Sequence, residues 1–176
     1  ETGTVMVKDI EDGPTGSNVR NFALINGTIY FFATTSASAY GLWQTDGTPG
    51  GTELVKSFTG IPDYLTNVNG VLFFSGYDDS NGHELWKSDG TSGGTVLVKD
   101  IVSGSTSTSP INFFNSNGIL YFTTSSGNIQ VWKSDGTSGG TVLVKDGFQQ
   151  ILVTYPFEFV NVNGLTCFSA FEQKNG

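Results

Sequence analysis

The chain has 176 residues, a formal net charge of −8 and 24 glycines, whereas average usage would give about twelve glycines. Only eight lysines and arginines are present, which argues against a nucleic-acid partner, because such a partner requires a basic surface. No apolar run approaches the roughly 18 residues of a membrane-spanning helix, so we expect no membrane insertion. The single cysteine, Cys167, excludes an internal disulfide and a cysteine-based zinc site.

In chain order, each stretch of about 46 residues begins with two predicted strands joined by Asn-Gly. This dipeptide between apolar runs predicts a tight hairpin, because both residues tolerate positive φ. The second strand of each pair is apolar on both faces, which favours a central strand between neighbouring sheets. The first strands are predicted over 22–25, 64–65, 113–114 and 157–162, and the second over 28–33, 71–75, 119–123 and 165–169.

The third predicted strand carries a tryptophan and runs into a turn-rich motif. Leu-Trp-x-x-Asp-Gly-Thr occurs at 42–48 and 85–91, and with Val for Leu at 131–137. A fourth strand follows in the sequence Gly-Thr-x-Leu-Val-Lys at 51–56, 94–99 and 140–145, and Gly-Thr-Val-Met-Val-Lys at 3–8 repeats it at the start of the chain. The glycine-rich connection between the two strands predicts a hairpin.

Four strands in a period of 40 to 50 residues are typical of a β-propeller blade. We therefore expect one all-β domain over 1–176, a β-propeller or propeller fragment of about four blades with four antiparallel strands per repeat. The repeats are placed at about 11–56, 57–101, 102–146, and 147–176 together with 1–10. An up-and-down barrel is the structural alternative. Either the N-terminal strand completes the last blade, or the chain is a stretch of a longer array, which we favour because the last repeat stops mid-blade.

The segment Glu84-Leu-Trp-Lys-Ser-Asp-Gly-Thr91 resembles the ELWxxDGT repeat, also called hyalin-like, of large secreted or surface bacterial proteins. The similarity covers nearly the whole chain. It departs from the pattern at Gly41, at Gln130, and at Cys167, where the other repeats have an aromatic residue. The resemblance implies a propeller-like repeat of adhesins and exported multidomain proteins, in a secreted or cell-surface location, and it implies no established reaction.

Trp43, Trp86 and Trp132 recur once per repeat and are the candidate ligand-binding residues. Aromatic rings at equivalent positions can line one sugar-binding pocket per blade. They can equally serve packing between blades, because tryptophan buries a large apolar area. Both interpretations stay open at this stage.

The candidate metal ligands lie in the densest polar loop, and Ca²⁺ is the only cofactor that we consider. Carboxylate and amide oxygens suit Ca²⁺, although the loop lacks EF-hand spacing and its counterparts over 35–40 and 125–128 are uncharged, which favours a variable surface loop instead. We interpret the aspartates of the Asp-Gly-Thr motifs mainly as turn residues. The alternative is a ring of carboxylates that binds Ca²⁺ or a ligand. The loop ligands are Asp78, Asp79, Asn81 and Glu84.

The sequence favours a non-catalytic module for adhesion or for interaction with an extracellular protein or glycan. A carbohydrate-binding lectin with sites repeated between blades is the alternative. An enzyme such as a glycosidase would need a unique carboxylate pair about 5 to 9 Å apart, whereas these carboxylates recur with the repeats, and the only histidine, His83, has no partner motif. Open blade faces also predict self-association or contact with the remainder of a longer parent chain.

Overall fold

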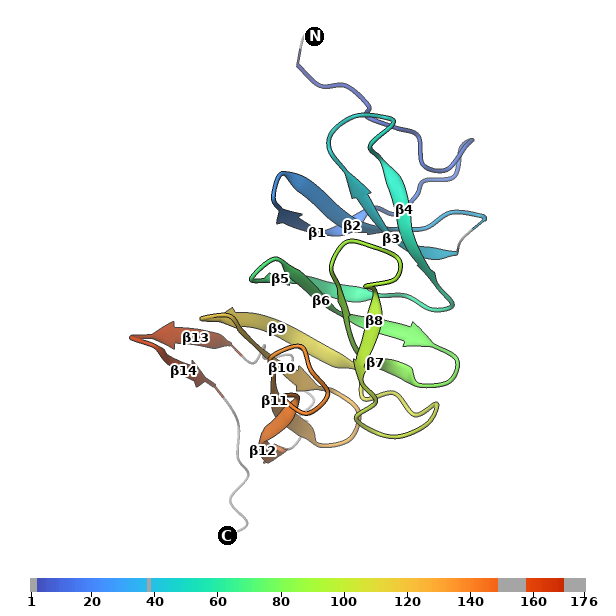
Figure 1. Ribbon diagram of the computed structural model, residues 1–176. Helices are drawn as coiled ribbons and strands as arrows, with labels where there is room; N and C mark the ends of the chain where they lie inside the picture. Colours follow the sequence, from blue (N-terminus) through green and yellow to red (C-terminus); the bar gives the residue numbers. More distant parts are fainter. Residues whose placement is uncertain (1–2, 38, 149–157, 170–176) are drawn as a thin grey trace.

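The computed structural model describes residues 3–37, 39–148 and 158–169, which form strands, turns and loops (Figure 1). Three four-stranded sheets and one two-stranded sheet are present in this part of the chain, and all strand pairs within them are antiparallel. Within the same residues, no helix is long and apolar enough to cross a lipid bilayer. The all-β class expected from the sequence is confirmed.

Each four-stranded sheet is a simple meander in which consecutive strands pair. The first sheet comprises β1 (Arg20–Ile25), β2 (Thr28–Ala33), β3 (Tyr40–Thr45) and β4 (Glu53–Phe58). The second comprises β5 (Asp63–Val68), β6 (Val71–Asp78), β7 (Gly82–Ser88) and β8 (Val96–Lys99). The third comprises β9 (Pro110–Ser116), β10 (Ile119–Thr124), β11 (Ile129–Ser134) and β12 (Val142–Phe148). The two-stranded sheet pairs β13 (Phe159–Val162) with β14 (Leu165–Phe168).

The Asn-Gly hairpins form as the sequence predicts. The asparagine has φ between 50° and 52° in all four hairpins, and the glycine that follows has φ between 83° and 87°. Positive φ at both central residues is the requirement of a type I′ turn, whose twist matches that of the flanking strands. The register of each hairpin is therefore fixed locally; the four asparagines are Asn26, Asn69, Asn117 and Asn163.

The sheets stack through their second strands. On β2, Phe32 packs towards the second sheet while its neighbour Phe31 packs on the opposite side, and both are at most 3% exposed. On β6, Phe74 faces the first sheet and Phe73 faces the third. Successive side chains of a strand point to opposite faces, so a strand buried on both faces joins two interfaces, as its two-sided apolar sequence predicts.

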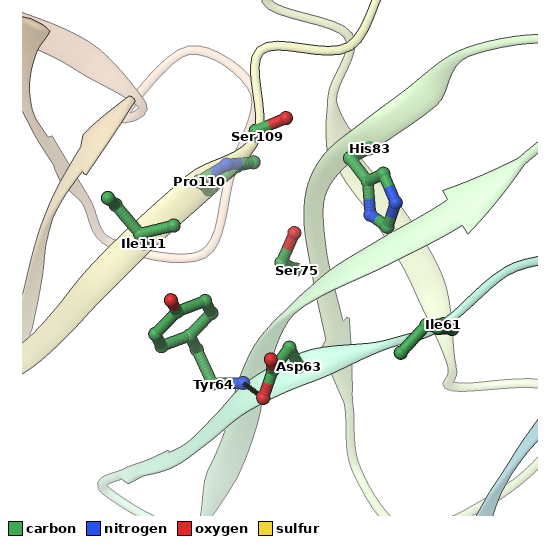
Figure 2. Close-up of a pocket in the computed structure, with 8 residues that line it drawn as sticks. All are labelled: Ile61, Asp63, Tyr64, Ser75, His83, Ser109, Pro110 and Ile111. Atoms are coloured by element: carbon green, nitrogen blue, oxygen red, sulfur yellow. Dashed lines mark hydrogen bonds between the residues drawn. The ribbon is translucent and has the colours of Figure 1, made fainter. Parts of the chain in front are cut away.

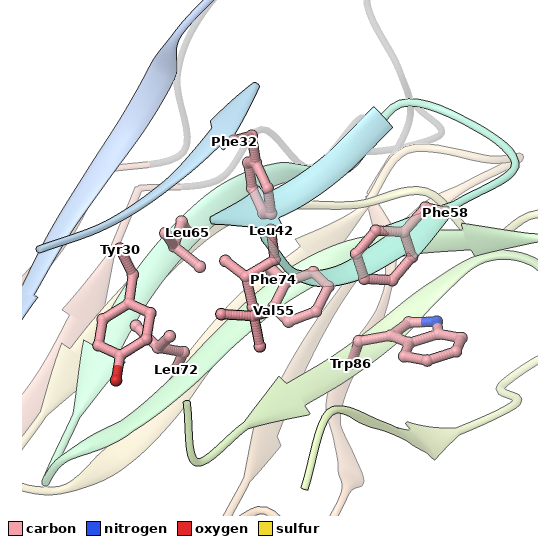
Figure 3. Close-up of a cluster of buried hydrophobic side chains, with 9 residues drawn as sticks. All are labelled: Tyr30, Phe32, Leu42, Val55, Phe58, Leu65, Leu72, Phe74 and Trp86. Atoms are coloured by element: carbon pink, nitrogen blue, oxygen red, sulfur yellow. The ribbon is translucent and has the colours of Figure 1, made fainter. Parts of the chain in front are cut away.

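The largest cluster lies between the first and second sheets (Figure 3). Phe74 is at its centre, with ring centroids 5.5 Å from Phe32 and 5.6 Å from Phe58. Phe58 also meets Trp86 edge-on at 5.6 Å. Edge-to-face pairs of this kind add to the free energy gained from burial. The sequence motif ends at Lys56, but β4 continues for two more residues to Phe58, which pairs with Tyr40 of β3.

The first strands of successive sheets lie side by side, so that β5 contacts both β1 and β9, and β9 contacts β13. One asparagine per strand links them. Asn67 Nδ2 donates to Leu24 O at 2.8 Å, Asn115 Nδ2 donates to Asn67 O at 3.1 Å, and Asn161 Nδ2 donates to Ser116 Oγ at 2.7 Å. The sheets thus follow one another in a regular order along the molecule (Figure 1).

The N-terminal segment does not form the strand that its sequence predicts. Residues 4–9 pair with no strand of the described chain. The segment nevertheless makes the contacts of a preceding repeat. Lys8 Nζ donates to Thr52 O at 2.7 Å, as Lys99 Nζ donates to Thr141 O at 2.9 Å between the second and third sheets, and Ile10 packs on the outer face of the first sheet.

The closure that we considered for the last blade is not what the structure shows. The N-terminal segment lies against the first sheet, at the opposite end of the stack from β14 (Figure 1). Among the described residues β14 pairs only with β13. The four sheets form an open succession rather than a closed ring, and the fold class that the structure establishes is all-β with four-stranded antiparallel sheets.

Replacing Phe74 by alanine should lower the free energy of unfolding by about 3–5 kcal/mol, because it removes a fully buried ring and leaves a cavity between two sheets. Leu24→Ala is the matched control, since Leu24 is 61% exposed, and its effect should stay within about 0.5 kcal/mol. Chemical denaturation measures both. Similar effects of the two substitutions would contradict the packing described here.

Candidate functional site

The Asp-Gly-Thr turns have the same internal bonding in all three sheets. In the second sheet Asp89 Oδ1 accepts the Thr91 N–H at 2.9 Å and the Thr91 hydroxyl at 2.7 Å. Thr91 Oγ1 in turn accepts the N–H of Gly94 at 2.9 Å. The Thr91 bonds hold the pKa of Asp89 below its usual value. Asp46 and Asp135 make the same bonds, so these carboxylates serve Asx-type turns.

Each of these turns closes with a glycine because a side chain at that position would have no room. A Cβ atom on Gly94 would lie 2.0 Å from Oδ1 of Asp89, far inside van der Waals contact, and Gly51 and Gly140 are in the same position towards their own aspartates. The second glycine of each repeated Gly-Gly is therefore explained by the carboxylate that folds back over it.

The three candidate tryptophans all lie in packing positions. Trp43 is 9% exposed and packs with Phe31 on the outer face of the first sheet, and Trp86 is 7% exposed within the cluster of Figure 3. Trp132 is half-buried, and its ring stacks on Phe122 at 6.5 Å. Lysines from the preceding sheet cover two of the rings, with Lys56 Nζ 5.9 Å from the Trp86 centroid and Lys99 Nζ 6.0 Å from that of Trp132.

The four candidate metal ligands are not gathered into one site. Asp78 Oδ1 accepts the N–H groups of Ser80 and Asn81, both at 2.8 Å, and both Asp78 oxygens accept from the Asn81 amide, while Asp79 is exposed. Glu84 lies inside β7 and is fully buried. Across the part of the chain that the structure describes, no three acidic, histidine or cysteine side chains are close enough together to hold a metal ion.

Glu84 instead holds the segment that leads into the third sheet. Its Oε2 accepts the Thr108 hydroxyl at 2.8 Å and the Ile101 N–H at 3.1 Å, and its Oε1 accepts the Thr108 N–H at 3.2 Å. Burial raises the pKa of Glu84 to about 7 against these bonds, which favour the charged form, and the nearby Asp100 raises it further. The carbonyl of the neighbouring His83 also accepts the N–H groups of Thr108 and Ser109 at 3.1 Å.

The segment fixed in this way forms one wall of a cavity of about 260 Å³ between the second sheet and β9 (Figure 2). Figure 2 shows Tyr64 and Ile111 on one side, His83 on the other, and Ser75 and Asp63 between them. The lining residues come from the end of the β4–β5 connection, from β5, β6 and β7, and from the start of β9: Ile61, Asp63, Tyr64, Ser75, His83, Ser109, Pro110 and Ile111.

Tyr64 lies in a β-bulge with φ of 62°. The first strands of the neighbouring sheets have a bulge at the same place, and there the residue with positive φ is Asn21 or Asn112. Asparagine adopts this left-handed conformation readily, whereas a bulky aromatic residue does so rarely and at a cost. Tyr64 therefore departs from the repeat at a conformationally demanding position.

The cavity exists because two side chains of the second sheet differ from their counterparts in the first sheet. Phe32 stands where the second sheet has Ser75, and Tyr40 stands where it has His83. Phe32 fills its own interface and is 1% exposed. The smaller serine and the shorter imidazole leave the corresponding space open beside β9.

Two polar side chains of the cavity are unpaired within the described chain. Neither the Ser75 hydroxyl nor the His83 imidazole has a hydrogen-bond partner there, although the His83 ring lies 4.9 Å from that of Tyr77. Burial lowers the pKa of His83, opposed by the charge of Asp63, and burial raises the pKa of Tyr64. At neutral pH the cavity thus contains a neutral imidazole and a neutral phenol.

Sequence reasoning missed this site because it looked for residues that recur. Of the cavity residues it singled out only His83, and it read that residue as a loop histidine without a partner. The signal available in the sequence was a residue that departs from the repeat pattern. At the positions of Tyr64 and His83 the second repeat differs in residue type from its neighbours, and these two differences meet in one place.

No protein-family profile and no curated protein matches this sequence. Among solved structures, the crystal structure of the computationally designed Ika8 protein is similar with a TM-score of 0.51 at 14% identity, over 93% of this chain and 46% of that one. The computationally designed Ika4 protein also gives 0.51 at 13% identity, over 97% and 100% of the two chains. This chain spans about half the length of Ika8. At such identities the likeness concerns the fold alone.

Glu84 should make the stability of the chain depend on pH between about 5 and about 8. Because its folded pKa is about 7, above the ordinary 4.5, the folded state binds more protons in this range and loses stability as pH rises through it. The difference in unfolding free energy between wild type and Glu84→Gln should therefore favour wild type more at pH 5 than at pH 8. His83 is present in both proteins and cancels. A difference independent of pH would contradict the assignment.

Proposed function

We propose that this chain is a non-catalytic binding module of a secreted or cell-surface protein, built from successive blades of a β-propeller-type array. The proposal rests on one observation, which is that recurrent and non-recurrent side chains have different uses. Residues that recur in every repeat are used for turns and packing, whereas Tyr64 and His83, which differ in type from their counterparts in the neighbouring sheets, line a cavity at a sheet junction. A rigid repeated frame with one variable pocket is the usual arrangement of a binding protein.

The stacking of the sheets supports the blade interpretation. Each of the three four-stranded sheets is a meander whose first strand neighbours the first strands of the adjacent sheets, and whose second strand is buried on both sides. The N-terminal segment uses Lys8 and Ile10 against the first sheet in the way that Lys99 and Ile101 are used against the third. One interface therefore propagates from repeat to repeat, as in other repeat proteins.

The bonding of the carboxylates supports a non-catalytic role. The turn aspartates are each bonded to their own threonine, and Glu84 is bonded to Ile101 and Thr108. General acid–base chemistry needs a carboxyl group within reach of a substrate. These carboxyl groups instead satisfy backbone and hydroxyl donors of the chain itself.

A lectin is the second candidate, and the cavity favours it. Aromatic and aliphatic side chains beside a few polar groups are the usual lining of a small-ligand site. The sequence predicts a lectin with tryptophan-lined sites repeated between blades. Here the tryptophans lie in packing positions, and Tyr64 and His83 of the pocket do not recur.

The proposal predicts saturable binding without turnover. The purified chain should bind at least one member of a panel of immobilised glycans and extracellular-matrix proteins, measured by biolayer interferometry. It should release no product from chromogenic glycosides under the same conditions. Phe74→Ala, which loosens the sheet packing, should reduce binding in proportion to the unfolded fraction. Turnover of any substrate, or no binding to either class of ligand, would contradict the proposal.

A further inference from the structure

We propose that the cavity between β5, β7 and β9 binds one neutral sugar residue of a glycan, with the ring of Tyr64 as the surface on which the sugar lies. This inference rests on the proposed binding function and makes it more specific. It assigns one site at one sheet junction, and it assigns the ligand to the class of neutral polyhydroxylated rings.

The chemistry of the lining matches both faces of a sugar. Tyr64 is 40% exposed and Ile61 is 47% exposed, so that an apolar wall is open to an approaching ligand. The C–H groups of a pyranose ring pack against such a wall, and an aromatic ring with a polar tip suits a ligand that is partly apolar and partly wet. The volume of about 260 Å³ is at the small end of ligand pockets, which suits a single ring.

The polar groups at the centre of the cavity suit hydroxyl groups, each of which both donates and accepts. The Ser75 hydroxyl can do both, and the neutral imidazole of His83 offers one donor and one acceptor. Neither side chain is paired within the described residues. A sugar would therefore satisfy groups that the protein leaves open, at no cost of breaking internal hydrogen bonds.

An ammonium ligand fits these groups less well. It would need a carboxylate, and Asp63 Oδ1 already accepts the Tyr64 N–H at 2.9 Å and the side-chain amide of Asn21, so that only Oδ2 of Asp63 remains for an ammonium group. An ammonium group donates only, so it would also leave the donor of the imidazole unpaired. The mixture of donors and acceptors favours a neutral polyol.

The conformation of Tyr64 points to a selected role for its ring. Two neighbouring sheets place asparagine at this bulge, and tyrosine at φ of 62° costs stability that asparagine would not. Strained positions are often kept at ligand sites, where the strain positions a side chain. The bulge turns the ring towards Phe113 of the next sheet, on which it stacks at 6.1 Å, and so fixes it at the rim of the cavity.

The segment that closes the cavity is also fixed before any ligand arrives. Thr108 is held by the buried Glu84, and Ser109 by the carbonyl of His83. A wall that does not have to be ordered on binding lowers the entropic cost of association. Glu84 is accordingly a positioning residue, since it follows His83 in β7 but does not itself line the cavity.

The single histidine allows the site to be tested directly. Methyl glycosides of the common hexoses and N-acetylhexosamines, at millimolar concentration, are titrated against the full chain while the imidazole C–H signals of His83 are followed by NMR. At least one glycoside should shift these signals saturably. Tyr64→Asn, which restores the residue of the neighbouring sheets and so should fold at least as well, should weaken binding by about tenfold or more. Tyr64→Phe should bind nearly as well as wild type.

Two further variants complete the test. Ser75→Phe introduces the side chain that fills the first interface and should abolish binding, and Phe22→Ala, at an exposed aromatic residue of β1, should leave it unchanged. Unperturbed His83 signals with every glycoside, undiminished binding by Tyr64→Asn, or saturation by n-butylamine in place of the sugars would overturn the assignment. If immobilised ligands still bind in any of these cases, the binding function stands and only this site is wrong.

Discussion

The burial of one strand on both of its faces is the constraint on which the rest of the structure depends. A strand offers alternate side chains to opposite sides, so a second strand such as β6 must be covered twice, by Phe32 and Phe58 on one side and by Leu120 and Phe122 on the other. One sheet alone cannot satisfy this requirement. Adjacent repeats therefore have to stack, and the same interface appears between the first and second sheets and between the second and third.

The recurrent polar residues serve the same end. The Asp-Gly-Thr turn closes on itself, with the aspartate bonded to its threonine and the threonine to the closing glycine, so the loop between the third and fourth strands keeps one shape in every sheet. The lysine at the end of the fourth strand then reaches the following repeat, as Lys99 does at Thr141 and over Trp132. These residues recur because each junction poses the same geometric problem.

The residues that do not recur serve a different purpose. His83 stands where the first sheet has the larger Tyr40, Tyr64 occupies a backbone conformation that asparagine would adopt more easily, and Glu84 is buried at a cost shown by its raised pKa. Together they create and brace one cavity, which is why departures from the repeat are more informative about binding than the repeat itself.

Local chemistry explains how much of this structure could be read from the sequence. The Asn-Gly hairpins, the two-sided central strands and the aspartate turns depend on residues close together in the chain, and the structure has them where they are predicted, except that β14 is largely exposed in its two-stranded sheet. The first strand of each sheet could be placed only roughly, since its bulge depends on pairing across the sheet.

Only the tertiary structure decided what the repeated and unique residues do. The tryptophans have the same local sequence whether they bind ligands or fill an interface, and their burial by a neighbouring repeat settles where they lie. Glu84 is only five residues from Asp79, yet strand alternation directs the glutamate to Thr108, whereas the loop residue Asp79 stays exposed. The cavity joins side chains up to 50 residues apart, from Ile61 to Ile111. Sequence determines local conformation through near neighbours, whereas a site between sheets depends on how distant segments pack.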